Sequence, residues 1–162
     1  MKPTDYIGRP LVPRVVLVER GPAANFATAV KDDSAVYQRP DAAKEAGFAG
    51  IPVPPTYSFA MHHWGAFAEL QPEAPADAVR LDDLISALRA EGGLIMHAEQ
   101  EFEYFAPIVV GDLLRVTGVV EDVYTKTSSS GRQMTFAKVR TEVRNEAEEL
   151  VVRETMTLLH RP

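Results

Sequence analysis

Residues able to transfer protons gather at one place in the first third of the chain. The segment reads Lys31-Asp32-Asp33-Ser34-Ala35-Val36-Tyr37. An aspartate can take up a proton or hold a water molecule, and a tyrosine hydroxyl can donate or accept a hydrogen bond. The ordinary pKa of tyrosine is about 10, so Tyr37 exchanges protons poorly near neutral pH. Asp32 and Tyr37 are the first candidates for a catalytic site; a solvated loop carboxylate and a packing tyrosine are the ordinary alternatives.

A second group of candidates lies where a helix is expected to begin, at Pro55 and Thr56. Proline lacks an N–H, which costs nothing in the first turn of a helix. The Thr56 N–H and the positive end of the helix dipole suit a developing oxyanion. The aromatic side chains of Tyr57 and Phe59 follow, and we expect them to pack in the core and to line a tunnel.

The histidines offer weaker candidates. His62 and His63 point about 100° apart on a helix, so they cannot share a metal ion, and we expect one to be packed and the other to lie at the helix edge. His97 alternates with glutamates along a strand, and the spacing matches no established metal site. We expect His97 on the outer, solvated face of that strand, although a bulge would turn it inward and make it a reserve candidate for a base. No metal site is predicted.

Helices occupy the first part of the chain and strands the second, the pattern of an α+β protein. Hydrophobic spacing, glycines and prolines predict helices over residues 23–30, 41–46, 57–68 and 81–90, and strands over 15–18, 94–105, 113–124, 134–144 and 150–160. The helix over 57–68 is apolar on nearly every face, which indicates burial. The four long strands should form an antiparallel meander around it, with a turn at 107–112 and a hairpin loop at 127–131. This arrangement predicts a single hot-dog domain over residues 1–162, with a curved antiparallel sheet wrapped around a central apolar helix.

Composition narrows the classes of function. The chain has 162 residues, a formal net charge of −6 and no cysteine. Disulfides, thiolate metal sites and cysteine nucleophiles are therefore excluded, and an acidic chain argues against nucleic-acid binding. The N-terminus lacks the apolar core of a signal peptide, and no apolar run approaches the roughly 20 residues of a membrane helix. We expect a soluble, cytoplasmic protein without a membrane or nucleic-acid partner.

The chain resembles the MaoC-like hydratase/dehydratase family, and within it the branch of FAS1-like dehydratase domains. The order and spacing of several segments carry this resemblance: the Asp32 loop, the Ala46-Gly47-Phe48 turn, the proline-rich run before Thr56, the block from His97 to Tyr104, and Pro107-Ile108-Val109-Val110-Gly111-Asp112. It implies a lyase of fatty acid metabolism that needs no cofactor. Such domains pair side by side or work in tandem, and they add water to, or remove it from, CoA or carrier-protein thioesters. The acyl chain lies in a tunnel beside the central helix.

The resemblance also implies roles for particular residues. In the family, an Asp-x-Asn-Pro-x-His motif holds the reacting water, and a glycine N–H at the start of the central helix polarises the thioester carbonyl. The motif's aspartate matches Asp32, its asparagine Ser34, its proline Ala35 and its histidine Tyr37, and the glycine matches Pro55. Asp32 and Tyr37 thus take the catalytic positions, with Ser34 and Pro55 beside the substrate.

These differences bear on the chemistry. Removing a proton next to a thioester requires a base, a proton donor for the leaving hydroxyl and donors for the enolate-like oxygen. Tyr37 replaces the histidine that would exchange protons, and Pro55 replaces the glycine whose N–H would bind the oxygen. Losing one oxyanion donor costs about 10²–10³ in rate. The sequence therefore predicts a hydratase/dehydratase component, interconverting 3-hydroxyacyl and 2-enoyl thioesters of CoA or carrier protein, with a degenerate catalytic pair. A non-catalytic acyl-binding subunit of a heteromeric dehydratase and a hot-dog acyl-CoA thioesterase are the alternatives.

Assembly is expected because an open sheet leaves an edge strand that must be paired or blunted. We predict a homodimer or a higher homo-oligomer. A heteromer with a hot-dog subunit that carries the intact aspartate–histidine motif is the other possibility. The sequence does not specify the acyl chain.

Overall fold

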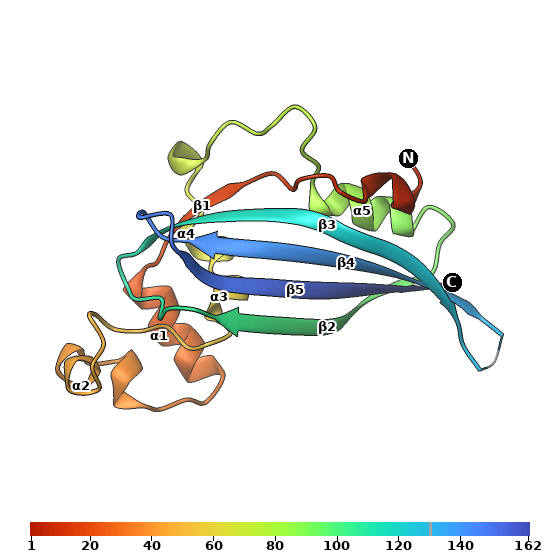
Figure 1. The fold of residues 1–162 in the computed structure, drawn as a ribbon. Helices are drawn as coiled ribbons and strands as arrows, with labels where there is room; N and C mark the ends of the chain where they lie inside the picture. The colour runs from red at the N-terminus through yellow and green to blue at the C-terminus, as the bar shows by residue number, and fades with distance from the viewer. Residues whose placement is uncertain (130) are drawn as a thin grey trace.

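A five-stranded antiparallel sheet forms the frame of the molecule in the computed structural model, which describes residues 1–129 and 131–162 (Figure 1). The strands are β1 Arg14–Leu17, β2 Leu94–Tyr104, β3 Leu113–Thr127, β4 Gln133–Arg144 and β5 Leu150–Arg161. Each lies within a few residues of its predicted range, because runs of β-branched and alternating apolar residues end at glycines, prolines or short polar turns. The predicted loop over residues 127–131 includes Ser130, which lies outside the described residues.

The position of β2 differs from the predicted meander. The strands β3, β4 and β5 are consecutive neighbours, but the sheet order β1-β3-β4-β5-β2 places β2 beside β5 at the far edge. The connection from β2 to β3 crosses the end of the sheet: the Phe105 N–H donates to Val151 O, and the Gly111 N–H donates to Val18 O. The meander prediction was wrong for this strand, because a segment that we interpreted as a local turn instead bonds to β5 and to the end of β1.

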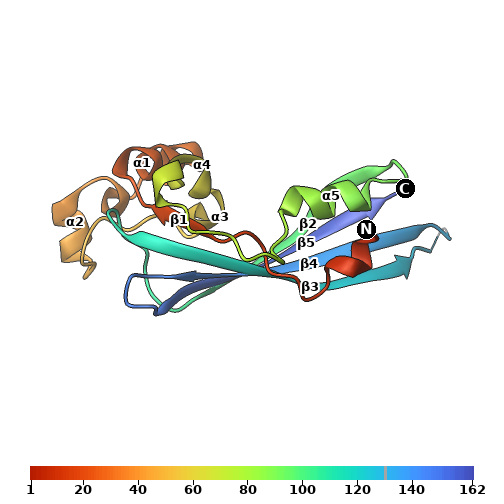
Figure 2. The same cartoon turned by 90° about the horizontal axis from the view of Figure 1, so that it is seen from above.

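Helices cover one face of the sheet in two groups (Figure 2). The group α1–α4 gathers over one end of the sheet, and α5 lies over the other end, near the N-terminus. The α-helices are α1 Arg20–Ala29, α2 Pro40–Glu45, α3 Tyr57–Ala60, α4 His62–Gly65 and α5 Leu81–Leu88, and the 3-10 turns are η1 Pro3–Tyr6, η2 Ala35–Tyr37 and η3 Ala68–Leu70. Within residues 1–129 and 131–162, no helix has the length and apolar character needed to cross a membrane.

The central helix is shorter than its composition predicts. Instead of one buried helix over residues 57–68, the chain forms the two four-residue helices α3 and α4. Tyr57 and Met61 are buried, but Phe59 and Trp64 are 37% and 46% exposed. The prediction of an all-round buried helix was therefore wrong. Apolar composition indicates contact with a core, but it does not fix how many helical turns the core accommodates.

The contact between α4 and β1 explains where the helix ends. A methyl group at Gly65 would overlap the carbonyl oxygen of Leu17, so only glycine allows this approach. Beyond Gly65 the chain runs beside β1, where the Gln71 side chain replaces a neighbouring strand. Its Nε2 donates to Val15 O at 2.9 Å, and its Oε1 accepts from the Val15 N–H at 3.1 Å.

The apolar core consists of two clusters beneath the two groups of helices. One cluster packs under α5 and includes Leu84, Leu88, Val120, Val139 and Leu158. The other packs under α1 and α3 and includes Val16, Tyr57, Met61, Leu114 and Val152. Because the central helix is short, it does not cover the sheet between these clusters continuously.

Candidate functional site

Local hydrogen bonds hold the Asp32 loop in place. Lys31 adopts a left-handed backbone conformation with φ of 59° and thereby ends α1, and the Asp32 N–H donates to Ala27 O. Asp32 Oδ1 accepts a hydrogen bond from the Ser34 N–H at 3.1 Å, and the short turn η2 leads on to Tyr37. Asp32 is thus half-buried with one oxygen engaged by its own loop, and Ser34 is exposed.

Tyr37 stands over an apolar groove beside the start of α3. Pro54, Pro55, Phe105 and Ile108 line this groove of about 390 Å³ together with Tyr37; Asp32 is not among its lining residues. Partial burial raises the pKa of the Tyr37 hydroxyl, and the negative charge of Asp32 raises it further. Tyr37 therefore remains a neutral phenol at physiological pH. It can donate a hydrogen bond, but it is a poor proton shuttle.

The start of α3 offers an amide donor. No acceptor among the described residues takes the Thr56 N–H, whereas the next amide, that of Tyr57, donates to Pro54 O. The carbonyl oxygen of Pro55 accepts the Tyr104 hydroxyl at 2.7 Å. Tyr57 is 1% exposed and stacks on Trp64, so it packs in the core and lines neither the groove nor the second cavity described next.

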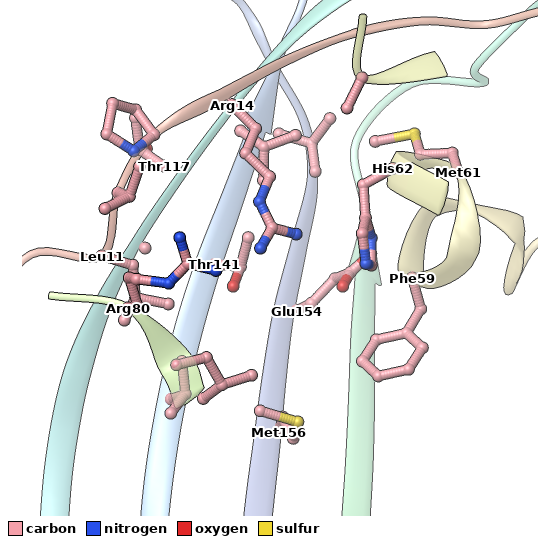
Figure 3. A pocket seen from close by; sticks show the side chains of 18 of the residues that line it. Leu11, Arg14, Phe59, Met61, His62, Arg80, Thr117, Thr141, Glu154 and Met156 are labelled. Atoms are coloured by element: carbon pink, nitrogen blue, oxygen red, sulfur yellow. The ribbon is translucent and has the colours of Figure 1, made fainter. Parts of the chain in front are cut away.

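The second cavity, which we call the trough, lies on the helix-covered face of the sheet between α3–α4 and the start of α5 (Figure 3). Its volume is about 720 Å³. Apolar side chains such as Met61, Val139 and Met156 form much of its surface, and Phe59 lies at its side. Of the predicted binding residues, the trough includes Phe59 and the groove includes Pro55, whereas Ser34 and Thr56 line neither.

Polar side chains that the sequence analysis did not select also face the trough. Within the described residues, the buried side-chain atoms without a hydrogen-bond partner are Ser58 Oγ, Gln100 Nε2 and Glu154 Oε1, and all three residues line the trough. Glu154 is 6% exposed, and burial raises the pKa of its carboxyl, a rise that the nearby Ser58 hydroxyl partly offsets. The sequence holds a signal for Glu154, because it alternates with the inward-facing Val152, Met156 and Leu158 in β5.

Charged groups surround the same space. Arg14 and Arg80 project over the trough in Figure 3, and Arg14 forms no ion pair with any described carboxylate. Burial lowers the pKa of His62 to about 4, with the charges of Arg14 and His63 adding to the effect. His62 is therefore neutral at physiological pH. As expected, His62 is half-buried and His63 is exposed, but their rings do not point apart: the ring centroids are 4.1 Å from each other.

A β-bulge in β2 places His97 on the face of the sheet that carries the helices. His97 pairs with Leu158 and Glu99 with Thr157, so Ala98 is the extra residue. His97 consequently contacts the Phe59 ring, with ring centroids 5.2 Å apart, and its Nε2 lies 3.1 Å from Gln100 Oε1. The expected outer face was therefore wrong and the bulged alternative is what the structure has, but His97 remains exposed, as the sequence predicted.

The predicted site residues therefore divide between separate places. Asp32 and Tyr37 share one loop, Tyr37 and Pro55 share the groove, and Phe59 belongs to the trough. His97 does not line the trough, but its Nε2 contacts the side chain of Gln100, which does. In the part of the chain that the structure describes, no three acidic or histidine side chains cluster so as to hold a metal ion.

Known proteins similar to this chain fall into one group. A family model described as FAS1-like, dehydratase domain region matches residues 5–154. A UPF0336 protein of Streptomyces avermitilis is 33% identical over 159 residues, which cover 97% of this chain and 93% of that protein. A UPF0336 protein of Saccharopolyspora erythraea is 31% identical over 158 residues, covering 97% and 90%.

Solved structures with the same fold include proteins described as hydratases and dehydratases. The ChsH1-ChsH2 complex from Mycobacterium tuberculosis gives a TM-score of 0.74 at 21% identity, covering 94% of this chain and 84% of that one. The C-terminally truncated HadBC (3R-hydroxyacyl-ACP dehydratase) complex from the same organism gives 0.70 at 20% identity, covering 96% and 98%. The R-hydratase PhaJ1 from Pseudomonas aeruginosa gives 0.62 at 18% identity, covering 96% and 81%. The fold is thus the hot-dog fold, and the chain belongs to the family of FAS1-like dehydratase domain regions.

Proposed function

We propose that this chain is the acyl-binding component of an acyl-thioester hydratase/dehydratase, and that a partner subunit supplies the residues that transfer protons. Membership of a dehydratase family supports the reaction class. The observation that favours assigning proton transfer to a partner subunit is the protonated hydroxyl of Tyr37. Tyr37 stands where the resemblance expects a histidine, and its pKa is raised rather than lowered.

The geometry of the loop supports the same division. A general base needs a free carboxylate within hydrogen-bond reach of the proton that it removes. Asp32 instead accepts the Ser34 N–H and lines neither the groove nor the trough. What the chain does offer to a thioester is binding: apolar surfaces in the groove and the trough for the acyl chain, and the unused Thr56 N–H, which lines neither cavity but directly follows Pro55 of the groove, for the carbonyl oxygen.

The free edge of β2 supports assembly with a partner. No described strand pairs with the outer side of β2, and Tyr104 and Phe105 at its end are about half exposed, at 48% and 49%. A long open edge beside exposed aromatic residues favours pairing with another chain. Two of the similar solved structures are described as complexes of two differently named proteins, ChsH1-ChsH2 and HadBC, which supports a heteromer here.

The proposal is tested in the assembled complex. The partner to try first is a hot-dog protein encoded beside this chain that carries an intact Asp-x-Asn-Pro-x-His motif. We expect Asp32→Asn and Tyr37→Phe in this chain to change the hydration rate of crotonyl-CoA by less than about threefold, because neither group transfers a proton. Replacing the partner's own aspartate should abolish activity and serves as the control. A loss of about 100-fold or more from Asp32→Asn would contradict the proposal, since this is the scale of a lost acid–base group.

A further inference from the structure

The trough has an unusual concentration of unpaired polar atoms. Buried side-chain donors and acceptors nearly always have a partner. Here Gln100 Nε2 and Glu154 Oε1 lack one, and the Ser58 hydroxyl lies close enough to the Glu154 carboxyl to lower its pKa without forming a well-placed hydrogen bond; all three residues line the same cavity. Ser58 and Glu154 are 5% and 6% exposed, so their surroundings are otherwise those of a core. Three polar groups that converge on one space without satisfying one another indicate a bound group that pairs them.

The sheet register brings two of these side chains to the same face. Gln100 pairs with Met156, and Phe102 pairs with Glu154, so Gln100 and Glu154 are diagonal neighbours across β2 and β5. Diagonal neighbours in a sheet are about 7–8 Å apart, so the long side chains of Gln100 and Glu154 can reach the same bound group. His97 Nε2 lies beside Gln100 Oε1, which directs the Gln100 amide nitrogen away from His97. Ser58 approaches Glu154 from α3, on the opposite side of the trough from the sheet.

The donors and acceptors present define the group that fits. Gln100 Nε2 can only donate, whereas a carboxylate oxygen can only accept while it is ionised. A hydroxyl group satisfies both at once, since it accepts from the amide and donates to the carboxylate, and Ser58 can take either role. A ketone oxygen can only accept, and an ammonium group can only donate. A carboxylate on the ligand could pair with Arg14, but it would leave Glu154 beside a group of its own charge.

The rest of the trough suits an aliphatic chain. Met61 and Met156 lie on either side of Glu154 in Figure 3, and Val139 and Val143 of β4 also line the trough. Methionine adapts well to flexible apolar ligands. The polar group is thus an isolated set of hydrogen-bonding atoms within an apolar cavity, which is how binding sites select one substituent on a chain.

We propose that the trough binds an aliphatic chain that carries a hydroxyl group, and that Ser58, Gln100 and Glu154 select this hydroxyl. The site rests on the proposed function, because the chain that it would hold is the acyl chain of the thioester. The selected hydroxyl lies on the chain beyond the reacting carbons, since neither Thr56 nor Tyr37 lines the trough. The substrate class is therefore acyl thioesters with a second, distal hydroxyl.

Binding of free fatty acids to the intact chain tests this site without an assay of catalysis. The probes are octadecanoic acid, a set of octadecanoic acids with one hydroxyl at successive positions, and the matching keto acids. Dissociation constants come from calorimetry and from the fluorescence of Trp64, the only tryptophan of the chain. We expect one hydroxy acid to bind roughly 5- to 100-fold more tightly than octadecanoic acid, because it pairs buried groups that otherwise stay unpaired. The matching keto acid should fall between them.

Two variants identify the residues responsible. Gln100→Met with Ser58→Ala should remove most of the preference for the hydroxy acid while octadecanoic acid binds at least as tightly as before. Glu101→Met is the matched control, because Glu101 neighbours Gln100 in β2 and is exposed on the other face. It should leave the preference unchanged. Ser58→Ala alone, a smaller change, should reduce the preference if the double variant does not fold.

Each other outcome overturns the proposal. Equal affinities for octadecanoic acid and every hydroxy acid would show that the three polar groups are satisfied by water. The trough would then bind plain chains, and the proposed function would stand. Retention of the preference in the folded double variant would place the selection elsewhere. If no probe binds, the trough is not an acyl site, and the result obtained with the partner subunit then decides the proposed function separately.

Discussion

Replacing Glu154 with methionine should make the protein more stable at neutral pH while removing a functional group. Glu154 is 6% exposed and lies in β5 next to Met156, in a row of otherwise apolar inward-facing residues. Its Oε1 has no partner among the described residues. Leaving a buried polar group unpaired costs about 1–3 kcal/mol, so Glu154→Met should gain a free energy of that size. For a domain of this length the gain raises the midpoint of thermal unfolding by roughly 2–12 °C.

The gain should depend on pH in a defined direction. Burial raises the pKa of the Glu154 carboxyl in the folded state. The wild-type protein therefore keeps the most stability below the unfolded-state pKa, which is about 4.3, and loses it as the pH rises through the folded pKa. Methionine has no proton to lose. The advantage of Glu154→Met should therefore be larger near pH 7 than near pH 4.

Urea unfolding at both pH values, followed by the fluorescence of Trp64, measures this difference. Glu101→Met is the control, because it removes an exposed carboxylate from the outer face of β2 and should change stability by less than about 0.5 kcal/mol. A loss of stability in Glu154→Met at pH 7, or a gain that is the same at both pH values, would refute the reasoning. Either result would mean that a stabilising partner compensates the buried carboxylate.

Two further substitutions test the packing and the charges around the trough. Gly65→Ala should destabilise the protein by about 1–3 kcal/mol, because the added methyl overlaps a carbonyl of β1. Gly21→Ala at an open position of α1 should be neutral or stabilising in the same unfolding experiment, and equal effects would contradict this contact. Arg14→Gln should raise the pKa of His62 from about 4 toward its usual value, as measured by NMR titration. Because the fold disfavours protonated His62, the variant should also lose less stability than wild type as the pH falls from about 6.5 toward 4, and an unchanged pKa would mean that burial alone sets it.

Local features of the chain were enough to predict most of the sheet. Strand bounds follow from β-branched runs and from the residues that interrupt them, so β3, β4 and β5 lie where they were expected. The place of β2 was not predictable in this way. It depends on hydrogen bonds between the 105–111 segment and distant strands, and such bonds leave no periodic pattern in the sequence.

The central helix and the bulge show a second limit. Apolar composition predicted the location of α3 and α4, but the break follows from the close approach of Gly65 to Leu17, which is a tertiary contact. The position of His97 on the helix-carrying face depends on one extra residue, Ala98, since a shift of one residue exchanges the two faces of a strand. Alternation in the sequence cannot show which residue is the extra one.

The candidate site was only partly accessible from the sequence. The resemblance led to the Asp32 loop and the start of α3, which the structure places near the groove. It did not lead to the trough, because Ser58, Gln100 and Glu154 come from three separate elements and belong to no common motif. The alternating pattern of β5 indicates that Glu154 faces inward. That its Oε1 has no partner among the described residues, however, depends on the folded arrangement.

The rate at which the isolated chain hydrates crotonyl-CoA tests the proposed division of labour most directly. Tyr37 stays protonated and Asp32 is engaged by its own loop, so the purified chain without a partner should turn over well below about 1 s⁻¹, the lower end of the usual range for enzymes. Addition of a subunit with the intact aspartate–histidine motif should bring the rate into that range. Turnover of about 1–10³ s⁻¹ by the isolated chain would contradict the account, because this chain would then supply its own proton-transfer groups.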